Sequence, residues 1–322
     1  MGGGDILVNS LMLQGWRRHA LLLVMLVSVA AYLGFVLWTG WDAVARAIAQ
    51  IGWGVTLLAL GLSLVNYALR FTRWQLYLAQ LGHKLPLAEH FKIYMAGFSM
   101  TIVPGKVGET IRSVFLKTHG VDYAKSVAVF FSEQGSNLIS MVLLAAAGAW
   151  VYPAAQPFVL GLGAVLVVIL ILLQQARLLL AIDKLGARVL PAKLAHIVHA
   201  AVTTVQHAGR CLRFPILPVG IVIGMVAWGA EGLALYFMLQ SLGSDISLQT
   251  ALFIYAFSML VGAVSFLPGG LGGVEASMVA LLMFYQLDQA HAVAVTLLVR
   301  LTTLWFAIAL GGLALTQIKQ GR

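Results

Sequence analysis

Two glycine-rich breaks decide how this chain folds: Pro104-Gly105-Lys106-Val107-Gly108-Glu109 and Pro268-Gly269-Gly270-Leu271-Gly272-Gly273-Val274-Glu275. Each break interrupts an apolar stretch and ends in a glutamate. In a bilayer, a broken helix and a carboxylate are both costly, and irregular backbone is tolerated only where protein or a water-filled cavity surrounds it. Two such features, ~165 positions apart in a chain of 322 residues, predict a duplicated unit with a central site.

The composition predicts an integral membrane protein. Hydrophobic residues make up 61% of the chain, charged residues 10%, and the mean hydropathy is +0.95. Long apolar runs fit membrane-spanning helices better than the alternating strands of a barrel. No polar stretch is long enough to build a separate soluble core. We therefore expect an all-α polytopic membrane protein.

The formal charge of +9 does not indicate a nucleic-acid partner. Most of the lysines and arginines stand at helix ends and in connecting loops, which is the positive-inside pattern of membrane proteins. These residues also suit anionic lipid headgroups. Cys211 is the only cysteine, which excludes an internal disulfide and a thiolate metal cluster. The sequence predicts no metal and no cofactor.

The order of apolar runs predicts six crossings and two hairpins. We expect spans over 20–38, 53–80, 125–150, the residues after Pro157 to about Leu180, 215–240 and 290–316, with a short loop around Asp42 and Arg46. The pieces on either side of each break are too short to cross alone, so 87–119 and 248–287 read as broken re-entrant helical hairpins. Residues 182–213 alternate basic and apolar positions at helical spacing, which predicts an amphipathic interfacial helix.

The two halves resemble each other. Ala96-Gly97-Phe98-Ser99-Met100 precedes the first break and Ala256-Phe257-Ser258-Met259 precedes the second. We therefore expect a first membrane repeat over 1–152 and a second over 153–322, which includes the cytoplasmic amphipathic segment 182–213. Each repeat has three crossings and one hairpin, and because three is odd the second repeat is inverted, which is typical of transporters.

The charge distribution predicts the orientation. The loops at 81–92, 104–125 and 181–213 are basic, whereas those at 151–157 and 241–249 carry almost no charge. We expect the basic loops and both termini in the cytoplasm of a bacterial cell, with the chain in the inner membrane.

The order of these features gives a specific resemblance. Arg73-Trp74, the first break, Glu133, the Pro-Gly-Gly-Leu-Gly-Gly-Val-Glu-Ala stretch at 268–276 and Arg300 follow one another. Over nearly its whole length the chain resembles the transmembrane region of the lysylphosphatidylglycerol synthases, a flippase-like family. The resemblance implies lipid movement between leaflets. Because the sequence ends at Arg322, we expect this chain to lack the aminoacyl-transferase domain of the longer relatives. Positions 133–137 read Glu-Gln-Gly-Ser-Asn, where relatives more often carry a Glu-Arg pair and an acid, which weakens the case for an ion-pair relay in this span.

The candidate site residues each have a functional and a structural interpretation. Glu109 and Glu275 line a polar path for a headgroup, or cap their own short helices. Arg112 and Arg300 hold a lipid phosphate, or form structural ion pairs with Glu133, Glu231 or the glutamates of the breaks. Lys106 neutralises a phosphate, or extends to the surface. The remaining break residues permit tight turns, or offer backbone N–H groups to an anion: Pro104, Gly105, Gly108, Pro268, Gly269, Gly270, Gly272 and Gly273.

Three functions remain open from the sequence. The first is a lipid translocase that moves a phospholipid or another polar-headgroup lipid through a midplane site between the two hairpins. The second is a membrane-embedded lipid-modifying enzyme with Glu109 or Glu275 as general base, although no nucleophile pair or metal cluster supports it. The third is a non-transporting partner of a hopanoid, glycan-lipid or aminoacyl-lipid pathway. The expected partners are membrane lipids, with a headgroup-modifying enzyme and a homo-oligomer left open.

Overall fold

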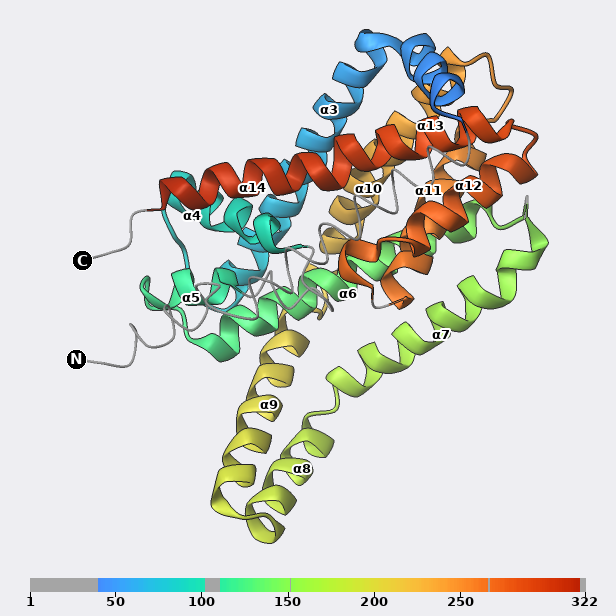
Figure 1. Cartoon of the computed structure of the whole chain (residues 1–322). Coiled ribbons are helices and arrows are strands. Elements are labelled where there is room, and N and C mark those ends of the chain that lie inside the picture. The colour runs from blue at the N-terminus through green and yellow to red at the C-terminus, as the bar shows by residue number, and fades with distance from the viewer. Residues whose placement is uncertain (1–39, 102–110, 151, 266, 319–322) are drawn as a thin grey trace.

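The computed structural model describes residues 40–101, 111–150, 152–265 and 267–318 (Figure 1). These residues form helices and turns, with no strand among them, which confirms the all-α prediction. The first predicted span and the whole first break lie outside the described residues.

Five helical stretches in the described ranges are long and apolar enough to cross a bilayer. They are α3 (Trp41–Gln80), α6 (Tyr123–Gly148), α7 with the turn before it (Pro153–Leu173), α10 (Ile216–Ser241) and the α13–α14 run (Gln289–Gln317). Their surroundings differ, because 61% of the apolar window of α13–α14 is buried inside the protein but only 11% of that of α7. The α13 part of the last run therefore lies inside the bundle, whereas α7 lies at its periphery.

Helix α3 corrects one prediction. The residues around Asp42 and Arg46, expected to form a loop, belong to this helix, which begins at Trp41. The helix is interrupted only at Gly52, whose φ of 76° and ψ of 165° are not helical. Glycine adopts a positive φ at little cost, so the chain bends here and the predicted span from Trp53 follows the bend.

Short helices flank the two breaks. Before the first break stand α4 (Leu87–Ala96) and the 3₁₀ turn η1 (Gly97–Met100), and after it stands α5 (Ile111–Lys117). The second break is described: α11 (Leu248–Val264) is followed by the turn η4 (Pro268–Gly270) and by α12 (Gly273–Phe284).

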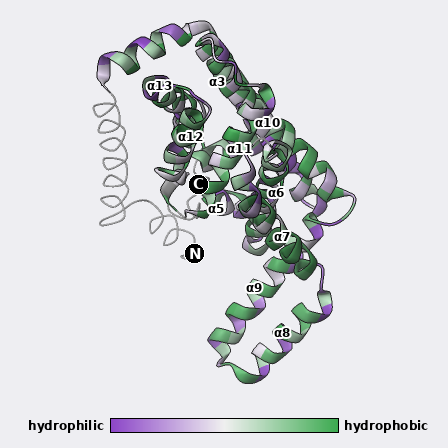
Figure 2. Ribbon diagram, turned by 90° about the vertical axis from the view of Figure 1, so that its right-hand side faces the viewer, coloured by the Kyte–Doolittle hydropathy of each residue, from purple (hydrophilic) through white to green (hydrophobic). Residues whose placement is uncertain are grey.

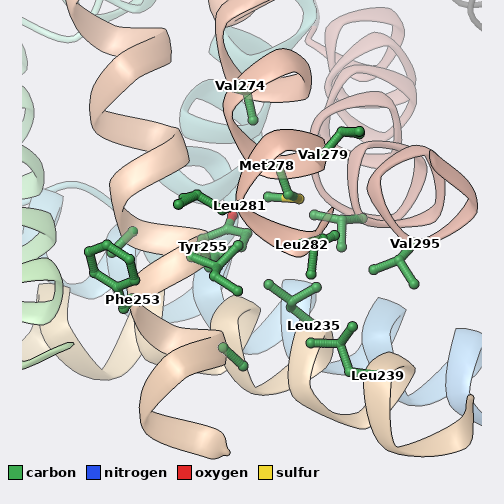
Figure 3. Close-up of a cluster of buried hydrophobic side chains, with 14 of the residues drawn as sticks. Leu235, Leu239, Phe253, Tyr255, Val274, Met278, Val279, Leu281, Leu282 and Val295 are labelled. Atoms are coloured by element: carbon green, nitrogen blue, oxygen red, sulfur yellow. The ribbon is translucent and has the colours of Figure 1, made fainter. Parts of the chain in front are cut away.

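Helices α11 and α12 pack closely against each other. A Cβ added at Gly262 would lie 2.3 Å from Val274 Cγ2, so only glycine fits at this crossing. Apolar side chains of α10, α11, α12 and α13 fill the space beside them, as Figure 3 shows for Leu235, Tyr255 and Met278. This core fixes the position of α12, which begins directly after the second break.

Helices α3 and α10 end in the same way. Each is followed by a glycine with positive φ, which is 85° at Gly82 and 73° at Gly243. The next amide then donates back into the helix, from His83 to the Leu78 carbonyl and from Ser244 to the Leu239 carbonyl. The helix ends, the glycines and the starts of the next helices are each separated by 161 positions: Gln80 and Ser241, Gly82 and Gly243, Leu87 and Leu248.

The amphipathic segment is two helices and not one. α8 (Ala176–Val189) and α9 (Ala192–Cys211) form a hairpin, because Pro191 cannot continue a helix. The preceding apolar helix α7 (Gln156–Leu173) stops at Leu173 and not near Leu180 as predicted. Figures 1 and 2 show the hairpin projecting from the bundle, with hydrophilic and hydrophobic residues alternating along it.

The last membrane stretch contains an irregular turn. α13 (Gln289–Arg300) continues through a π-helical turn, η5 (Leu301–Trp305), into α14 (Phe306–Gln317). Turns of this type occur often at functional sites. Here the π turn begins at the residue after Arg300, one of the predicted site residues.

Candidate functional site

Seven charged side chains apart from histidine are buried within the described residues. Each exposes 9% or less of its surface, although several lie on membrane-spanning helices. Charged groups at membrane depth are rare and usually functional. They are four arginines and three glutamates: Arg70, Arg73, Arg112, Arg300, Glu133, Glu231 and Glu275.

Glu133 on α6 is the centre of the first cluster. One carboxylate oxygen lies 3.3 Å from Nη2 of Arg70, and the other lies 3.2 Å from Nη1 of Arg112. The Tyr94 hydroxyl donates to the first oxygen at 2.6 Å. Glu133 therefore ties together α3, α4, α5 and α6. Gln134 stands where relatives more often carry a basic residue, which weakens the case for an ion-pair relay within this span, but the arginines that pair with Glu133 come from other helices.

Arg112 is held on several sides. Its Nε donates to the Tyr94 carbonyl at 2.9 Å, and its guanidinium lies 4.1 Å from the centre of the Tyr94 ring. Aromatic faces attract guanidinium groups by cation–π interaction. A Cβ added at Gly97 would lie 2.0 Å from the Arg112 Nε. Gly97 therefore leaves the space in which this arginine sits.

Arg73 has neutral partners. Its guanidinium donates to Oδ1 of Asn137 and, at 3.4 Å, to the Gly220 carbonyl. Trp228 Nε1 also donates to Asn137 Oδ1, at 2.9 Å. Within the described part of the chain no carboxylate forms an ion pair with Arg73. Its guanidinium therefore hydrogen-bonds to neutral groups of α6 and α10, while the charge of Glu133 acts on it without a direct contact.

The second cluster lies at the second break. Arg300 Nε donates to Oε1 of Glu275 at 2.6 Å, and Arg300 Nη2 donates to the Gly269 carbonyl at 2.7 Å. The other oxygen of Glu275 accepts from the Gly272 backbone N–H at 2.6 Å. Glu275 is thus both the cap of α12 and the partner of Arg300. Both structural interpretations, the cap and the ion pair, therefore apply to this residue.

Glu231 on α10 lies between the clusters. The Tyr255 hydroxyl on α11 donates to its Oε2. The charges of Arg70 and Arg300 both act on Glu231, and those of Glu231 and Arg70 act on Tyr67. The Tyr67 hydroxyl donates at 2.5 Å to the carbonyl of Thr303 in the π turn. The two clusters are therefore parts of one buried polar network.

The structure brings together the predicted residues that it describes. Arg112 pairs with Glu133, Arg300 pairs with Glu275, and the charges of Arg70 and Arg300 both act on Glu231. In the second break Gly269, Gly270 and Gly272 have φ of 60°, 68° and 83°, which confirms the turn requirement for these three. Gly273 begins α12 and Pro268 begins η4. Five predicted residues lie outside the described ranges: Pro104, Gly105, Lys106, Gly108 and Glu109.

Sequence reasoning misplaced two arginines. A basic and aromatic cluster near the end of an apolar run, here Arg70, Arg73 and Trp74, predicts a position at the membrane interface, but the two arginines are 7% and 0% exposed. They share one face of α3 with other polar residues, at spacings of three and four. This helical spacing of polar residues in an apolar helix could have predicted that the face is buried. The face consists of Ser63, Asn66, Tyr67, Arg70, Arg73 and Tyr77. The same spacing marks α6, through Glu133, Ser136, Asn137 and Ser140.

One histidine of the hairpin joins its two helices. His199 on α9 contacts the Asp183 carboxylate on α8 at 3.1 Å, so it joins the two arms. In the part of the chain that the structure describes, no group of three or more His, Cys, Asp and Glu side chains is placed to hold a metal.

Comparison with known proteins gives a consistent result. The sequence model of one family, the lysylphosphatidylglycerol synthase TM region, matches residues 24–311. The UPF0104 membrane protein PH1989 of Pyrococcus horikoshii is 23% identical over 321 residues, which cover 90% of this chain and 95% of that protein. A UPF0104 membrane protein of Methanothermobacter thermautotrophicus is 22% identical and covers 89% of this chain and 90% of its own. MJ1078 of Methanocaldococcus jannaschii is 26% identical, over 67% of this chain and 91% of that protein.

Proposed function

Because the chain belongs to the lysylphosphatidylglycerol synthase transmembrane-region family, we propose that it is a lipid translocase and not an enzyme. It moves a phospholipid or another polar-headgroup lipid between the leaflets of the bacterial inner membrane. The headgroup passes along the buried polar network, and the acyl chains stay in the bilayer.

The buried network is the observation that carries this proposal. A headgroup meets a large desolvation cost in hydrocarbon, and fixed charges and hydrogen-bonding groups along its path offset that cost. Arg112, Glu133, Arg70, Glu231, Arg300 and Glu275 supply such groups in sequence from one cluster to the other. Arginine suits a phosphate especially well, because its planar fork matches two phosphate oxygens.

We further propose that the chain consists of two inverted repeats, with the breaks as re-entrant hairpins that meet at the midplane. The matching ends of α3 and α10 support the repeat. Arg70 and Glu231 occupy equivalent positions in it, 161 apart, as do Tyr94 and Tyr255. Asn66 and Ala227 have the same separation and contact each other, since Asn66 Nδ2 donates to the Ala227 carbonyl at 2.9 Å.

A contact between equivalent positions is expected on the axis that relates two copies of a unit. The packed helices α3 and α10 run in opposite directions in Figure 1, as inversion requires. With the basic loops in the cytoplasm, both termini are cytoplasmic, and the network lies near the middle of the membrane.

A leaflet assay tests the translocase proposal. Purified full-length protein is reconstituted into vesicles that contain a trace of fluorescent phosphatidylglycerol, and an impermeant quencher reports the label that reaches the outer leaflet. We expect Glu275→Gln and Arg300→Ala each to slow exchange at least tenfold, because each removes one charge of the path. Arg188→Ala on the exposed hairpin is the matched control and should exchange at the wild-type rate.

Thermal melts of the same variants separate transport from folding. If the Arg300–Glu275 pair were only structural, Arg300→Ala would strand a buried carboxylate and lower the melting temperature, and the double variant would recover it. Wild-type exchange rates in both folded single variants would rule out this site as the path.

A further inference from the structure

Glu231 differs from the other two buried carboxylates. Glu133 touches two guanidinium groups and Glu275 touches one. Glu231 is 3% exposed, and its hydrogen-bond donor is the hydroxyl of Tyr255. Among the described residues no arginine, lysine or histidine forms an ion pair with it.

The groups around Glu231 come from every helix that packs on α10. Tyr255 of α11 donates to it, the charges of Arg70 on α3 and Arg300 on α13 act on it, and its own charge acts on Tyr67 of α3. From α6, Glu133 binds Arg70. Both nearby arginines already contact another carboxylate, Arg70 that of Glu133 and Arg300 that of Glu275. Glu231 thus shares their positive charge without a direct contact.

This arrangement makes the charge of Glu231 depend on what else binds the two arginines. A carboxylate at membrane depth is costly unless positive charge offsets it. An anion that binds Arg70 or Arg300 competes for that positive charge and adds a negative charge beside Glu231. Protonation of the Glu231 carboxylate to the neutral acid then removes the repulsion between the two negative charges.

We propose that Glu231 is a proton-binding site that takes up one proton when the phosphate of an anionic lipid occupies the network, and releases it when the lipid leaves. This rests on the proposed translocase function and adds the ion that moves with the lipid. In the step, an O–H bond forms on the Glu231 carboxylate with a proton from bulk water, and the same bond breaks on release. The network then holds the same net charge in its empty and occupied states.

Two consequences follow. Because binding free energies are reciprocal, the lipid raises the affinity of Glu231 for a proton and the proton raises the affinity of the site for the lipid by the same factor. A proton gradient across the membrane therefore drives net movement of an anionic lipid. When phosphatidylcholine binds, whose headgroup is neutral overall, the protein should take up fewer protons than when phosphatidylglycerol binds.

Proton uptake on lipid binding tests this directly. The full-length protein in weakly buffered uncharged detergent is titrated with phosphatidylglycerol, while a pH dye counts protons and native mass spectrometry counts bound lipid. We expect about one proton per bound phosphatidylglycerol in the wild type, and none in Glu231→Gln. Glu89→Gln, which alters an exposed carboxylate, should keep the wild-type stoichiometry. Equal uptake by Glu231→Gln would overturn the proposal.

Tyr255→Phe gives an independent readout, also in case Glu231→Gln does not fold. Its hydroxyl stabilises the carboxylate form of Glu231, so its loss should move the pH range of uptake upward without abolishing it. An unchanged range would count against Glu231 as the group that binds the proton.

The assays separate this inference from the proposed function. If a pH gradient does not change lipid exchange by the wild type, and if Glu231→Gln still exchanges lipid, the proton site is rejected and the translocase proposal is retained. If proton uptake requires Glu231 but the protein does not exchange lipid between leaflets, the proton site is retained and the translocase proposal is rejected.

Discussion

Buried arginines in this protein contact carboxylates, backbone carbonyls, a side-chain amide and aromatic faces. Arg112 contacts a carboxylate, a carbonyl and an aromatic face. Arg70 contacts a carboxylate and lies 5.1 Å from the centres of two rings, Phe98 and Trp228. Arg73 contacts an amide and a carbonyl. Because none of these charges reaches water freely, removing one partner leaves the other without compensation.

Glu133→Gln should therefore be strongly destabilising. The change leaves Arg70 and Arg112 buried together without their shared anion, which typically costs about 3–5 kcal/mol. A melt in detergent should show a large fall in melting temperature. Glu89→Gln, whose side chain is 56% exposed, should lower it only slightly. Equal effects of the two changes would show that Glu133 is not held as the structure indicates.

A pH-dependent contact joins α4 to the turn after α5. His119 Nε2 lies 2.9 Å from Oε1 of Glu89. Its hydrogen bond to the Phe115 carbonyl, and then Glu89, raise the pKa of His119 above its usual value. A raised pKa means that this contact stabilises the fold while the histidine is protonated and is lost as pH rises through the raised pKa.

Protection of the α4–α5 region should accordingly fall as the pH rises from about 6 to about 8. Hydrogen exchange followed by mass spectrometry measures this, and the change should be small because both side chains are partly exposed. In His119→Gln the dependence should disappear. A rise in protection with pH would contradict the assigned ion pair.

Close helix crossings depend on glycines that face a neighbouring helix. On α10, a Cβ at Gly224 would lie 2.2 Å from Ser140 Oγ and 2.6 Å from Arg73 Nη1. On α14, a Cβ at Gly311 would lie 2.4 Å from the Ser99 backbone nitrogen and 2.8 Å from the Met95 carbonyl oxygen. The first neighbours are side chains that can shift, whereas the second are backbone atoms that cannot.

Gly311→Ala should separate α14 from α4 and η1. Overpacking of this kind costs about 1–3 kcal/mol, so the melting temperature should fall. The next residue provides a matched control, since a Cβ at Gly312 meets nothing within 4 Å. Gly312→Ala should leave the melting temperature unchanged or raise it, because alanine favours a helix over glycine. A stable Gly311→Ala protein would mean that the two helices do not approach as described.

At the scale of the whole molecule, composition and break residues were enough to predict a helical membrane protein and the turn before α12. They did not predict the burial of Arg70 and Arg73, because an arginine near the end of an apolar run looks the same at an interface and inside a bundle. Partners of the buried charges come from helices far apart in the sequence, as Arg70 of α3 does for Glu133 of α6. Local patterns do not encode such contacts. The split of α8 and α9 could have been predicted from Pro191.

The proposed orientation can be tested with single cysteines in a Cys211→Ser background. Ala154 and Asp245 are exposed and lie in the two loops that carry little charge, and Ala192 is exposed between the arms of the basic hairpin. In intact cells an impermeant thiol reagent should label cysteine at 154 and 245 but not at 192. After lysis all three should react. Labelling of 192 alone in intact cells would reverse the orientation.

The π turn after Arg300 makes this membrane stretch sensitive to a change in chain length. An α-helix advances about 100° per residue, and a π turn takes up about one residue more than an α turn. If Leu301–Trp305 became regular helix with no residue removed, Arg300 would rotate relative to Gly311 by about 100°. Arg300 and Glu275 could then no longer meet while α14 keeps its place against α4. Deletion of one codon within the π turn would thus keep the ion pair, whereas deletion of one codon in α14 before Gly311 would uncouple it while both of its residues remain in the gene.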